Sequence, residues 1–226
     1  RELSFAGSRM YNLKTLQHAP QYTVLEYNPA DGAQEINLYD FATLTKVKTI
    51  FRAADHKQFA RLNSYTFTPN EQQLLIAVNS EYIYRHSFIA DYYLYDLASG
   101  KLRKITNDKI QSPLVSPDGK KIAFARNNDL YVYEVASGKE TRITTDGAKN
   151  KIINGIADWV YEEEFSTVRF FDWNADGTQL AFVRFDEQQV PEFSMDVYGT
   201  GLYPTQQTFK YPKAGEPNSG VSLHIY

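Results

Sequence analysis

The sequence predicts an all-β fold, a partial β-propeller of about four blades with one short helical insertion. Three observations support this prediction: a hairpin pattern recurs along the chain, a tight-turn motif recurs between the hairpins, and aromatic residues make up 15% of the 226 residues. Tyr and Phe, here 17 and 14 in number, favour strands. Repeats of roughly 40–50 residues with about four strands each are typical of propeller blades.

The hairpin pattern is clearest at residues 92–101, Tyr-Tyr-Leu-Tyr-Asp-Leu-Ala-Ser-Gly-Lys, which lead to Lys-Ile-Thr at 104–106. It returns at 130–139, Leu-Tyr-Val-Tyr-Glu-Val-Ala-Ser-Gly-Lys, before Arg-Ile-Thr at 142–144. A looser copy lies at 36–41. Each copy alternates large apolar with polar side chains, turns at small residues and then continues, which predicts a strand, a turn and a second strand.

The tight-turn motif is Ser-Pro-Asp-Gly-Lys-Lys-Ile-Ala-Phe-Ala at 116–125. It matches Asn-Ala-Asp-Gly-Thr-Gln-Leu-Ala-Phe-Val at 174–183 and, more loosely, residues 68–77. Asp-Gly sets a tight turn, and the apolar run after it predicts a buried strand. In chain order, the interval between the copies at 116–125 and 174–183 is longer than the interval before it, so an insertion is expected there. Residues 223–226 are expected to begin a further strand, which indicates a fragment of a propeller.

The run at 158–165, Asp-Trp-Val-Tyr-Glu-Glu-Glu-Phe, lies in the expected insertion. Asp158 is a good N-cap, and acidic residues suit the first turn of a helix, so a short helix is predicted over 159–165. The apolar neighbours should pack and hold three adjacent carboxylates in fixed directions. Clustered carboxylates favour a cation, which could be a metal ion, a basic side chain or the free amine of a ligand.

Helical geometry separates these alternatives, because successive residues of a helix point about 100° apart. Two adjacent glutamates can flank one ammonium group and accept its N–H donors, while the third points elsewhere. A divalent cation at 162–164 is the weaker alternative, since three adjacent glutamates cannot converge on one ion. Arg85 has aromatic neighbours at 84–88. Its guanidinium group either stacks on a tyrosine and stays solvated, or donates hydrogen bonds to a carbonyl or carboxylate.

Several other classes of function are disfavoured. A formal charge of −3 from 24 basic and 27 acidic residues offers no footprint for nucleic acid. The chain has no apolar stretch of the ~18 residues that a membrane helix needs and no cysteine for a disulfide or thiolate site. Residues 172–177 open like a calcium loop, but Val183 stands where that loop requires Glu, so a blade turn is expected. No metal, cofactor or complete catalytic constellation is expected.

The run at 158–164, with residues 85–87, 127–132, 154–156 and 211–215, resembles the dipeptidyl peptidase IV family. These motifs occur in the family's order over roughly residues 60–217, whereas the first sixty residues fit only by the repeat pattern. The resemblance implies an eight-bladed propeller that caps an α/β-hydrolase domain. Residues 1–226 would be the N-terminal part of that propeller, and the hydrolase domain with its Ser, Asp and His is absent from the chain.

The resemblance also implies roles for three residues. Glu163 and Glu164 match the pair that binds the α-ammonium of an oligopeptide substrate, and Arg85 matches the arginine that holds the carbonyl of its first residue. The parent protein would be a serine exopeptidase that releases dipeptides after a penultimate Pro or Ala. This chain alone would be inactive, with no catalytic residue of its own. Glu162 receives no assigned role and is expected to be structural.

The alternative is a stand-alone propeller that binds proteins without catalysis, which the absence of a catalytic triad favours. Open strand edges could pair with those of a second copy, so a homodimer is also considered. The chain has neither cysteine nor an Asn-x-Ser/Thr sequon, unlike the animal members of the family. This composition indicates an exported bacterial protein, periplasmic or extracellular.

Overall fold

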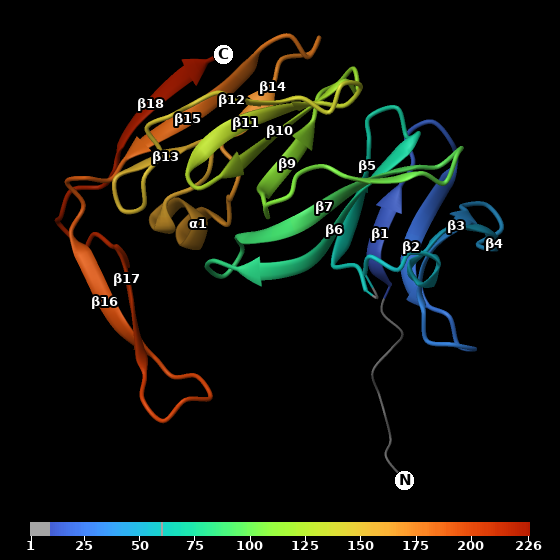
Figure 1. The fold of residues 1–226 in the computed structure, drawn as a ribbon, viewed down its shortest axis with the longest axis horizontal. Coiled ribbons are helices and arrows are strands. Elements are labelled where there is room, and N and C mark those ends of the chain that lie inside the picture. The colour runs from blue at the N-terminus through green and yellow to red at the C-terminus, as the bar shows by residue number, and fades with distance from the viewer. Residues whose placement is uncertain (1–9, 60) are drawn as a thin grey trace. The chain divides into compact units, whose positions relative to one another are not determined.

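The computed structural model describes residues 10–59 and 61–226, which form a nearly all-β fold with one short α-helix (Figure 1). The chain divides into two units. The first comprises residues 1–79 and 91–105, and the second comprises residues 80–90 and 106–226. Successive four-stranded antiparallel sheets follow one another in chain order, as expected for blades. The predicted fold class is therefore confirmed.

The first unit opens with the sheet β1–β2–β3–β4, in which each strand pairs with the next one in the chain. Its bounds are β1 Tyr11–Thr15, β2 Gln21–Tyr27, β3 Gln34–Asp40 and β4 Lys46–Arg52, and the 3₁₀ turn η1 (Ala53–Asp55) follows. The next sheet has the order β5–β6–β7–β8. Its bounds are β5 Ser64–Phe67, β6 Gln73–Tyr82, β7 Phe88–Asp96 and β8 Leu102–Lys104.

The first unit has its own apolar core, formed by side chains that include Leu25, Ile36, Phe51, Leu74 and Ile76. The predicted hairpin at 92–101 is present as β7, a turn and β8. Its turn closes because the Asp96 carboxylate accepts the backbone N–H and the hydroxyl of Ser99, and the pKa of Asp96 is lowered chiefly by these hydrogen bonds. Gly100 then takes φ of 68°, a left-handed conformation that favours glycine.

The second unit contains the sheet β12–β11–β10–β9, with bounds β9 Gln111–Val115, β10 Lys121–Arg126, β11 Asp129–Glu134 and β12 Glu140–Arg142. Asn127 and Asn128 join β10 to β11 with φ of 52° and 66°. Positive φ at both central residues is the signature of a tight hairpin turn whose twist matches the strands, and Asn tolerates it well. Both β10 and β11 are buried along most of their length.

The last sheet is centred on β15 (Leu180–Asp186), which pairs with β13 (Ile152–Asn154), β14 (Phe171–Trp173) and β18 (Gly220–Ile225). The helix α1 (Trp159–Phe165) lies between β13 and β14 in the chain, so the predicted insertion and the predicted helix bounds are confirmed. The expected blade turn at 174–178 is also present: the Asp176 carboxylate accepts the backbone N–H and the hydroxyl of Thr178. Residues 223–226 belong to a strand and its end, as predicted.

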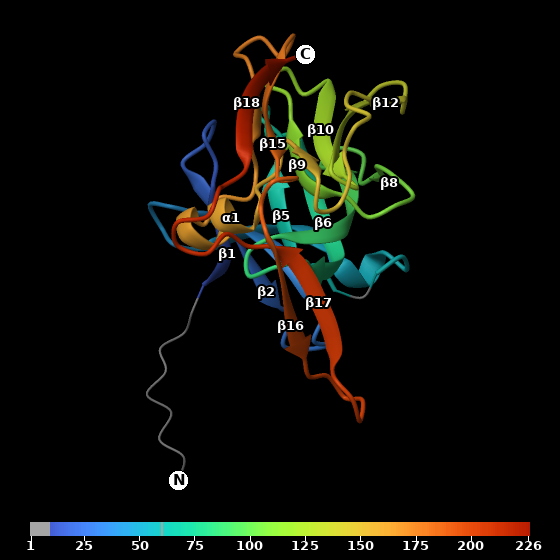
Figure 2. The ribbon, with the colours of Figure 1, turned by 90° about the vertical axis from the view of Figure 1, so that its left-hand side faces the viewer.

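A second insertion was not predicted from the sequence. The strands β16 (Glu192–Val197) and β17 (Thr205–Lys210) form a two-stranded hairpin between β15 and β18. Figure 2 shows this hairpin running away from the sheet of β15. The outer part of the hairpin is exposed, but Phe209 near its base is buried against the rest of the second unit.

The core of the second unit joins its two sheets. Its buried side chains include Leu130, Val132, Phe171, Leu180 and Phe185. The indole of Trp173 lies at the edge of this core and donates its N–H to the carbonyl oxygen of Leu114 at 3.2 Å. This rigid scaffold carries α1 and the turn between β6 and β7.

Candidate functional site

The helix α1 is fixed at both ends. The Asp158 carboxylate caps the N-terminus by accepting the Tyr161 N–H at 3.0 Å on one oxygen, and its other oxygen accepts the Ser219 hydroxyl at 2.6 Å. Ser166 ends the helix in the left-handed conformation with φ of 53°, and its N–H bonds to the carbonyl of Glu162. A helix of seven residues is too short to be stable alone, so these caps and its packing hold it.

Aromatic contacts set the direction in which α1 presents its acids. The Trp159 ring stacks on Phe209 with centroids 5.7 Å apart and meets the edge of Tyr211 at 4.7 Å. On the other side, Tyr161 makes edge contacts with Phe170 and Phe185 at 5.5 and 5.3 Å. The apolar frame that the sequence predicted therefore packs and fixes the orientation of α1, and its three glutamates leave the helix in different directions.

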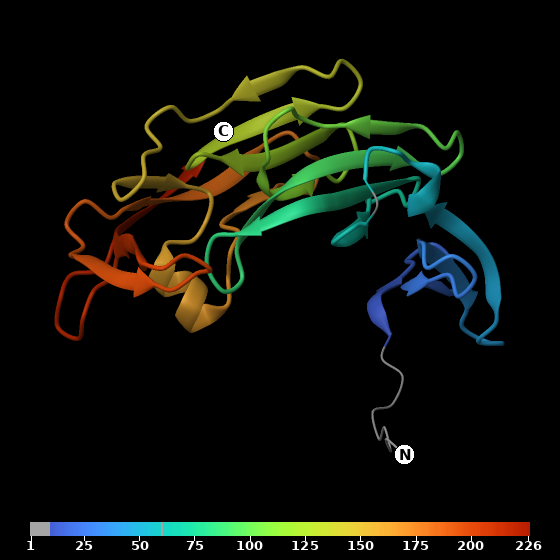
Figure 3. The same cartoon turned by 60° about the horizontal axis from the view of Figure 1, so that its bottom comes forward.

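Glu162 points into the protein and is 2% exposed. Its Oε1 accepts the backbone N–H of His86 at 2.8 Å and that of Ser87 at 2.7 Å. These residues lie in the turn between β6 and β7, which Figure 3 shows beside α1. Sequence reasoning gave Glu162 no specific role, because nothing in the chain indicates which backbone groups its carboxylate meets.

Glu163 and Arg85 lie together in the structure. The Arg85 Nε is 3.2 Å from Glu163 Oε2, and the Glu163 side chain is mostly covered while that of Arg85 is 71% exposed. An ion pair with one partner so exposed contributes only about 0–1 kcal/mol to stability. The contact uses Nε, so the two terminal nitrogens of the largely exposed guanidinium take no part in it.

Glu164 is exposed and lies on the outward side of α1. It lines a surface hollow of about 240 Å³ together with Trp159, Tyr211, Lys213 and Glu216. Within residues 10–59 and 61–226, no hydrogen bond or ion pair reaches its carboxylate. The structure thus brings Arg85 and Glu163 into contact and leaves Glu164 open at the next helical position.

A cavity of about 390 Å³ lies behind α1, on the side of Glu162. Asp158, Glu162 and Glu187 line it and are each at least nine-tenths buried. Burial, with the negative charge of Asp158 as the next cause, raises the pKa of Glu187 to about 7. Burial likewise raises the pKa of Tyr84 to about 12, with the nearby carboxylates adding to the effect, so this phenol stays neutral.

Glu187 and Tyr84 were not identified from the sequence. Glu187 lies in an ordinary polar stretch, Asp-Glu-Gln-Gln, which is typical of an exposed loop. Its burial depends on segments far away in the chain: its own N–H bonds to the carbonyl of Lys151, and Lys210 of β17 lines the same cavity. Only the folded structure shows this environment.

The three glutamates of α1 have three different surroundings. In the described part of the chain, no three His, Asp or Glu side chains are grouped so that they could hold a metal ion. Glu162 bonds to backbone N–H groups, Glu163 pairs with Arg85, and Glu164 points to another hollow. The described residues also contain no helix that is long and apolar enough to cross a membrane.

Comparison with known proteins agrees with this architecture. Residues 68–226 match the family model described as the dipeptidyl peptidase IV N-terminal region. Dipeptidyl peptidase 4 of Felis catus is 39% identical over 171 residues, covering 73% of this chain and 22% of that protein. Dipeptidyl aminopeptidase B of Saccharomyces cerevisiae is 36% identical over 169 residues, covering 73% of this chain and 20% of that protein.

The fold is also similar to a solved structure. Dipeptidyl peptidase 4 of Porphyromonas gingivalis superimposes with a TM-score of 0.86 and 37% sequence identity, covering 96% of this chain and 31% of that chain. The chain therefore spans between a fifth and a third of the length of these relatives. The match over residues 68–226 includes both the β6–β7 turn and α1.

Proposed function

The chain belongs to the dipeptidyl peptidase IV family, and from this premise we propose that its second unit recognises the free amino terminus of a peptide substrate. Glu163 and Glu164 would accept the hydrogen bonds of the α-ammonium group, and Arg85 would bind the carbonyl of the first residue. The observation that carries the proposal is the contact between Arg85 and Glu163, which places a guanidinium fork beside a mostly covered carboxylate.

The chemistry of these groups suits an amino terminus. An ammonium group carries three N–H donors, and charge-assisted bonds to carboxylates are stronger than neutral ones. Glu163 is held in place by the packed helix, while Glu164 is free to swing toward a ligand. The two terminal nitrogens of Arg85 lie outside the contact with Glu163, so they could donate to a carbonyl oxygen while the contact through Nε is kept.

Such a site would fix the distance between the amino terminus of the substrate and the bond that is cut. A substrate held by its ammonium group and first carbonyl presents a fixed bond to a catalytic group supplied elsewhere. We therefore propose that the chain serves a dipeptidyl aminopeptidase that releases dipeptides with a penultimate Pro or Ala. The bond would be cut by a Ser-Asp-His triad of an α/β-hydrolase domain, and none of its residues is assigned in this chain.

We also propose a cellular compartment and an oligomeric state for the protein. The absence of cysteine and of glycosylation sequons supports an exported bacterial protein, in the periplasm or outside the cell. Pairing of strand edges supports a homodimer, since β18 is exposed along its length. Size-exclusion chromatography with light scattering tests the second proposal.

Kinetics of the full-length product of the gene that encodes this chain would test the function. Glu163→Gln and Glu164→Gln should each lower kcat/KM for a Gly-Pro chromogenic substrate by about 10- to 100-fold, the loss expected for one charge-assisted bond. Glu134→Gln, at an exposed glutamate of β11 outside the site, is the control and should retain normal kcat/KM. Near-normal kcat/KM in both site variants would refute the assignment, and a wild-type product without peptidase activity would favour a propeller that only binds proteins.

A further inference from the structure

The turn that carries Arg85 is attached to α1 at two points. One is the ion pair between Arg85 and Glu163 at the surface. The other is buried: the Oε1 atom of Glu162 accepts the N–H groups of His86 and Ser87, the two residues that directly follow Arg85. Seventy-five residues of chain separate Glu162 from Ser87, so this contact is tertiary rather than local.

The two attachments differ greatly in strength. The surface pair is largely solvated because Arg85 is 71% exposed, and such pairs are weak. Glu162 is 2% exposed and Ser87 is 3% exposed, so the accepting carboxylate is shielded from bulk solvent. Both donors meet one carboxylate oxygen at 2.7–2.8 Å, the short distance typical of charge-assisted hydrogen bonds.

The turn around Arg85 has two other restraints. The Tyr84 ring meets Phe209 with centroids 6.1 Å apart, and the N–H of Ile83 bonds to the carbonyl of Ser87, while Arg85 and His86 are exposed. Without an acceptor on α1, the N–H groups of His86 and Ser87 would have to find water, and Ser87 is buried. The carboxylate of Glu162 therefore supplies the acceptor that holds this turn against the helix.

We propose that Glu162 is a positioning residue, which sets the location of Arg85 relative to Glu163 through the backbone of His86 and Ser87. The inference deepens the proposed function and rests on it: Glu163 and Glu164 contact the amino terminus, Arg85 contacts the carbonyl, and Glu162 touches neither. Its carboxylate determines whether the guanidinium and the two acids face the same ligand. All three glutamates of α1 then serve one site in two different ways.

Amide hydrogen exchange, measured by NMR on this chain, tests the contact without any ligand. In Glu162→Ala, exchange at His86 and Ser87 should accelerate by about 10- to 100-fold, the loss expected for a hydrogen bond to a charged group. Glu162→Gln keeps an oxygen acceptor and should give an intermediate acceleration. Glu187→Gln, a buried carboxylate in the same cavity, is the matched control and should leave these two amides unchanged.

Binding of Ala-Pro amide to the full-length gene product tests the consequence. Glu162→Ala should raise the dissociation constant of Ala-Pro amide about tenfold in the wild-type background. The increase should be much smaller in an Arg85→Ala background, because Glu162 acts through Arg85. Glu162→Gln should recover part of the affinity, whereas a general loss of structure would affect both backgrounds equally.

The outcomes separate the two proposals. Unchanged exchange at His86 and Ser87 in Glu162→Ala, or acceleration at all amides alike, would overturn the positioning role. So would equal losses of affinity with and without Arg85. Altered exchange at these two amides combined with a wild-type protein that does not bind Ala-Pro amide would instead contradict the proposed function and leave Glu162 as the anchor of this turn alone.

Discussion

Glu187 and Asp158 line the same cavity behind α1, and each is 5% exposed. Asp158 accepts two hydrogen bonds, from the Tyr161 N–H and the Ser219 hydroxyl. The charge on Asp158 adds to burial in raising the pKa of Glu187 to about 7, while Lys210 acts in the opposite direction. The Glu187 carboxyl group is therefore largely protonated in a slightly acidic medium.

The stability of the second unit should depend on pH through Glu187. Its pKa is about 7 in the folded state and 4.5 in an ordinary exposed glutamate, so the folded state binds the proton more tightly. The resulting stabilisation is complete below pH 4.5 and is lost as the pH rises to about 7. After allowance for solvent screening, we expect a loss of about 1–2 kcal/mol over this interval.

Urea unfolding of this chain at pH 5 and pH 8 checks this expectation. Glu187→Gln, which imitates the protonated side chain, should remove this part of the pH dependence and stabilise the protein at pH 8. Glu192→Gln is the control, because Glu192 is exposed. Identical pH profiles for wild type and Glu187→Gln would show that the cavity does not perturb this carboxyl group.

The cap of α1 gives a second prediction. Asp158→Ala removes the acceptor for the Tyr161 N–H and the partner of Ser219, and should cost about 1–2 kcal/mol. Asp158→Asn keeps a capping oxygen, so it should retain most of the stability, and it should lower the pKa of Glu187 by removing the neighbouring charge. NMR titration of the Glu187 carboxyl carbon measures the second effect. An unchanged pKa in Asp158→Asn would contradict the coupling.

Gly155 lies between β13 and α1 and gives a third prediction. It takes φ of 74°, and an added Cβ would lie 2.6 Å from a Leu130 methyl carbon in the core. Gly155→Ala should therefore combine left-handed strain with overpacking and cost about 2–4 kcal/mol. Gly32→Ala is the matched control: its φ is 72° but nothing lies within 4 Å of the added carbon, so it should cost about 1–2 kcal/mol. Equal costs in urea unfolding would exclude the contact with Leu130.

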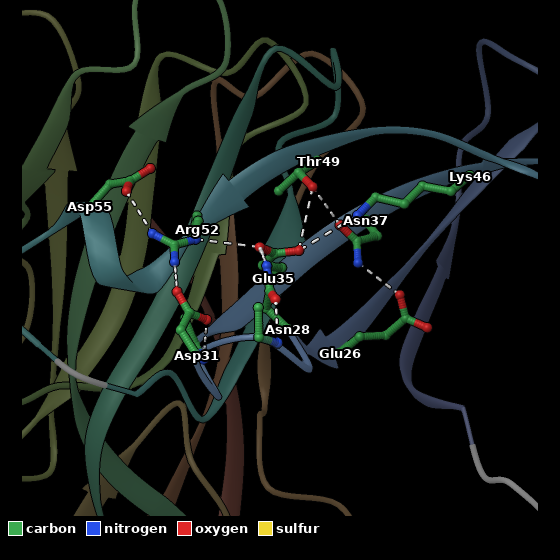
Figure 4. Close-up of polar contacts among 11 residues, drawn as sticks. Glu26, Asn28, Asp31, Glu35, Asn37, Lys46, Thr49, Arg52 and Asp55 are labelled. Atoms are coloured by element: carbon green, nitrogen blue, oxygen red, sulfur yellow. Dashed lines mark hydrogen bonds and ion pairs between the residues drawn. The ribbon is translucent and has the colours of Figure 1, made fainter.

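A buried polar network in the first unit gives a fourth prediction (Figure 4). Glu35 on β3 is 5% exposed and accepts the Asn28 side-chain N–H at 2.7 Å. It also pairs with Arg52 at 3.4 Å and Lys46 at 3.5 Å. Glu35→Ala removes the buried acceptor that Asn28, Lys46 and Arg52 share and should destabilise the protein by about 1–3 kcal/mol.

The control for Glu35 is Asp55→Ala. Asp55 also pairs with Arg52, but its side chain is 64% exposed, so its loss should change the stability by less than about 0.5 kcal/mol. Thermal unfolding of both variants gives the comparison. Similar melting temperatures for the two variants would show that burial of Glu35 adds nothing to the ion pair.

The regular part of this fold was predictable because each blade repeats a short pattern. Residues 92–101 alternate between apolar and polar side chains, and Asp-Gly within 116–125 sets a tight turn. Both signals are local, and the structure confirms the hairpin and the turn. The bounds of α1 were also predictable, since Asp158 is a local capping signal and the apolar residues around the glutamates pack as expected. The hairpin of β16 and β17 was missed although Phe193, Met195 and Val197 alternate with polar residues.

The site was predictable only in part. The resemblance identified Arg85, Glu163 and Glu164, and the structure places the first two in contact. The sequence shows that the helix carries acidic residues. It does not show which distant backbone groups each carboxylate contacts. The burial of Glu162 and Glu187 depends on the β6–β7 turn and on segments near Lys151 and Lys210, and no local pattern encodes such long-range contacts.

The most direct test of the central claim is the difference in affinity between Ala-Pro amide and its N-acetylated form, measured by calorimetry on the full-length gene product. Acetylation removes the positive charge and two of the three donors while leaving the rest of the ligand intact. If Glu163 and Glu164 bind the amino terminus, the free amine should bind at least about 100-fold more tightly than the acetylated ligand, as expected when paired carboxylates lose a charged partner. Equal affinities for the two ligands would contradict the account.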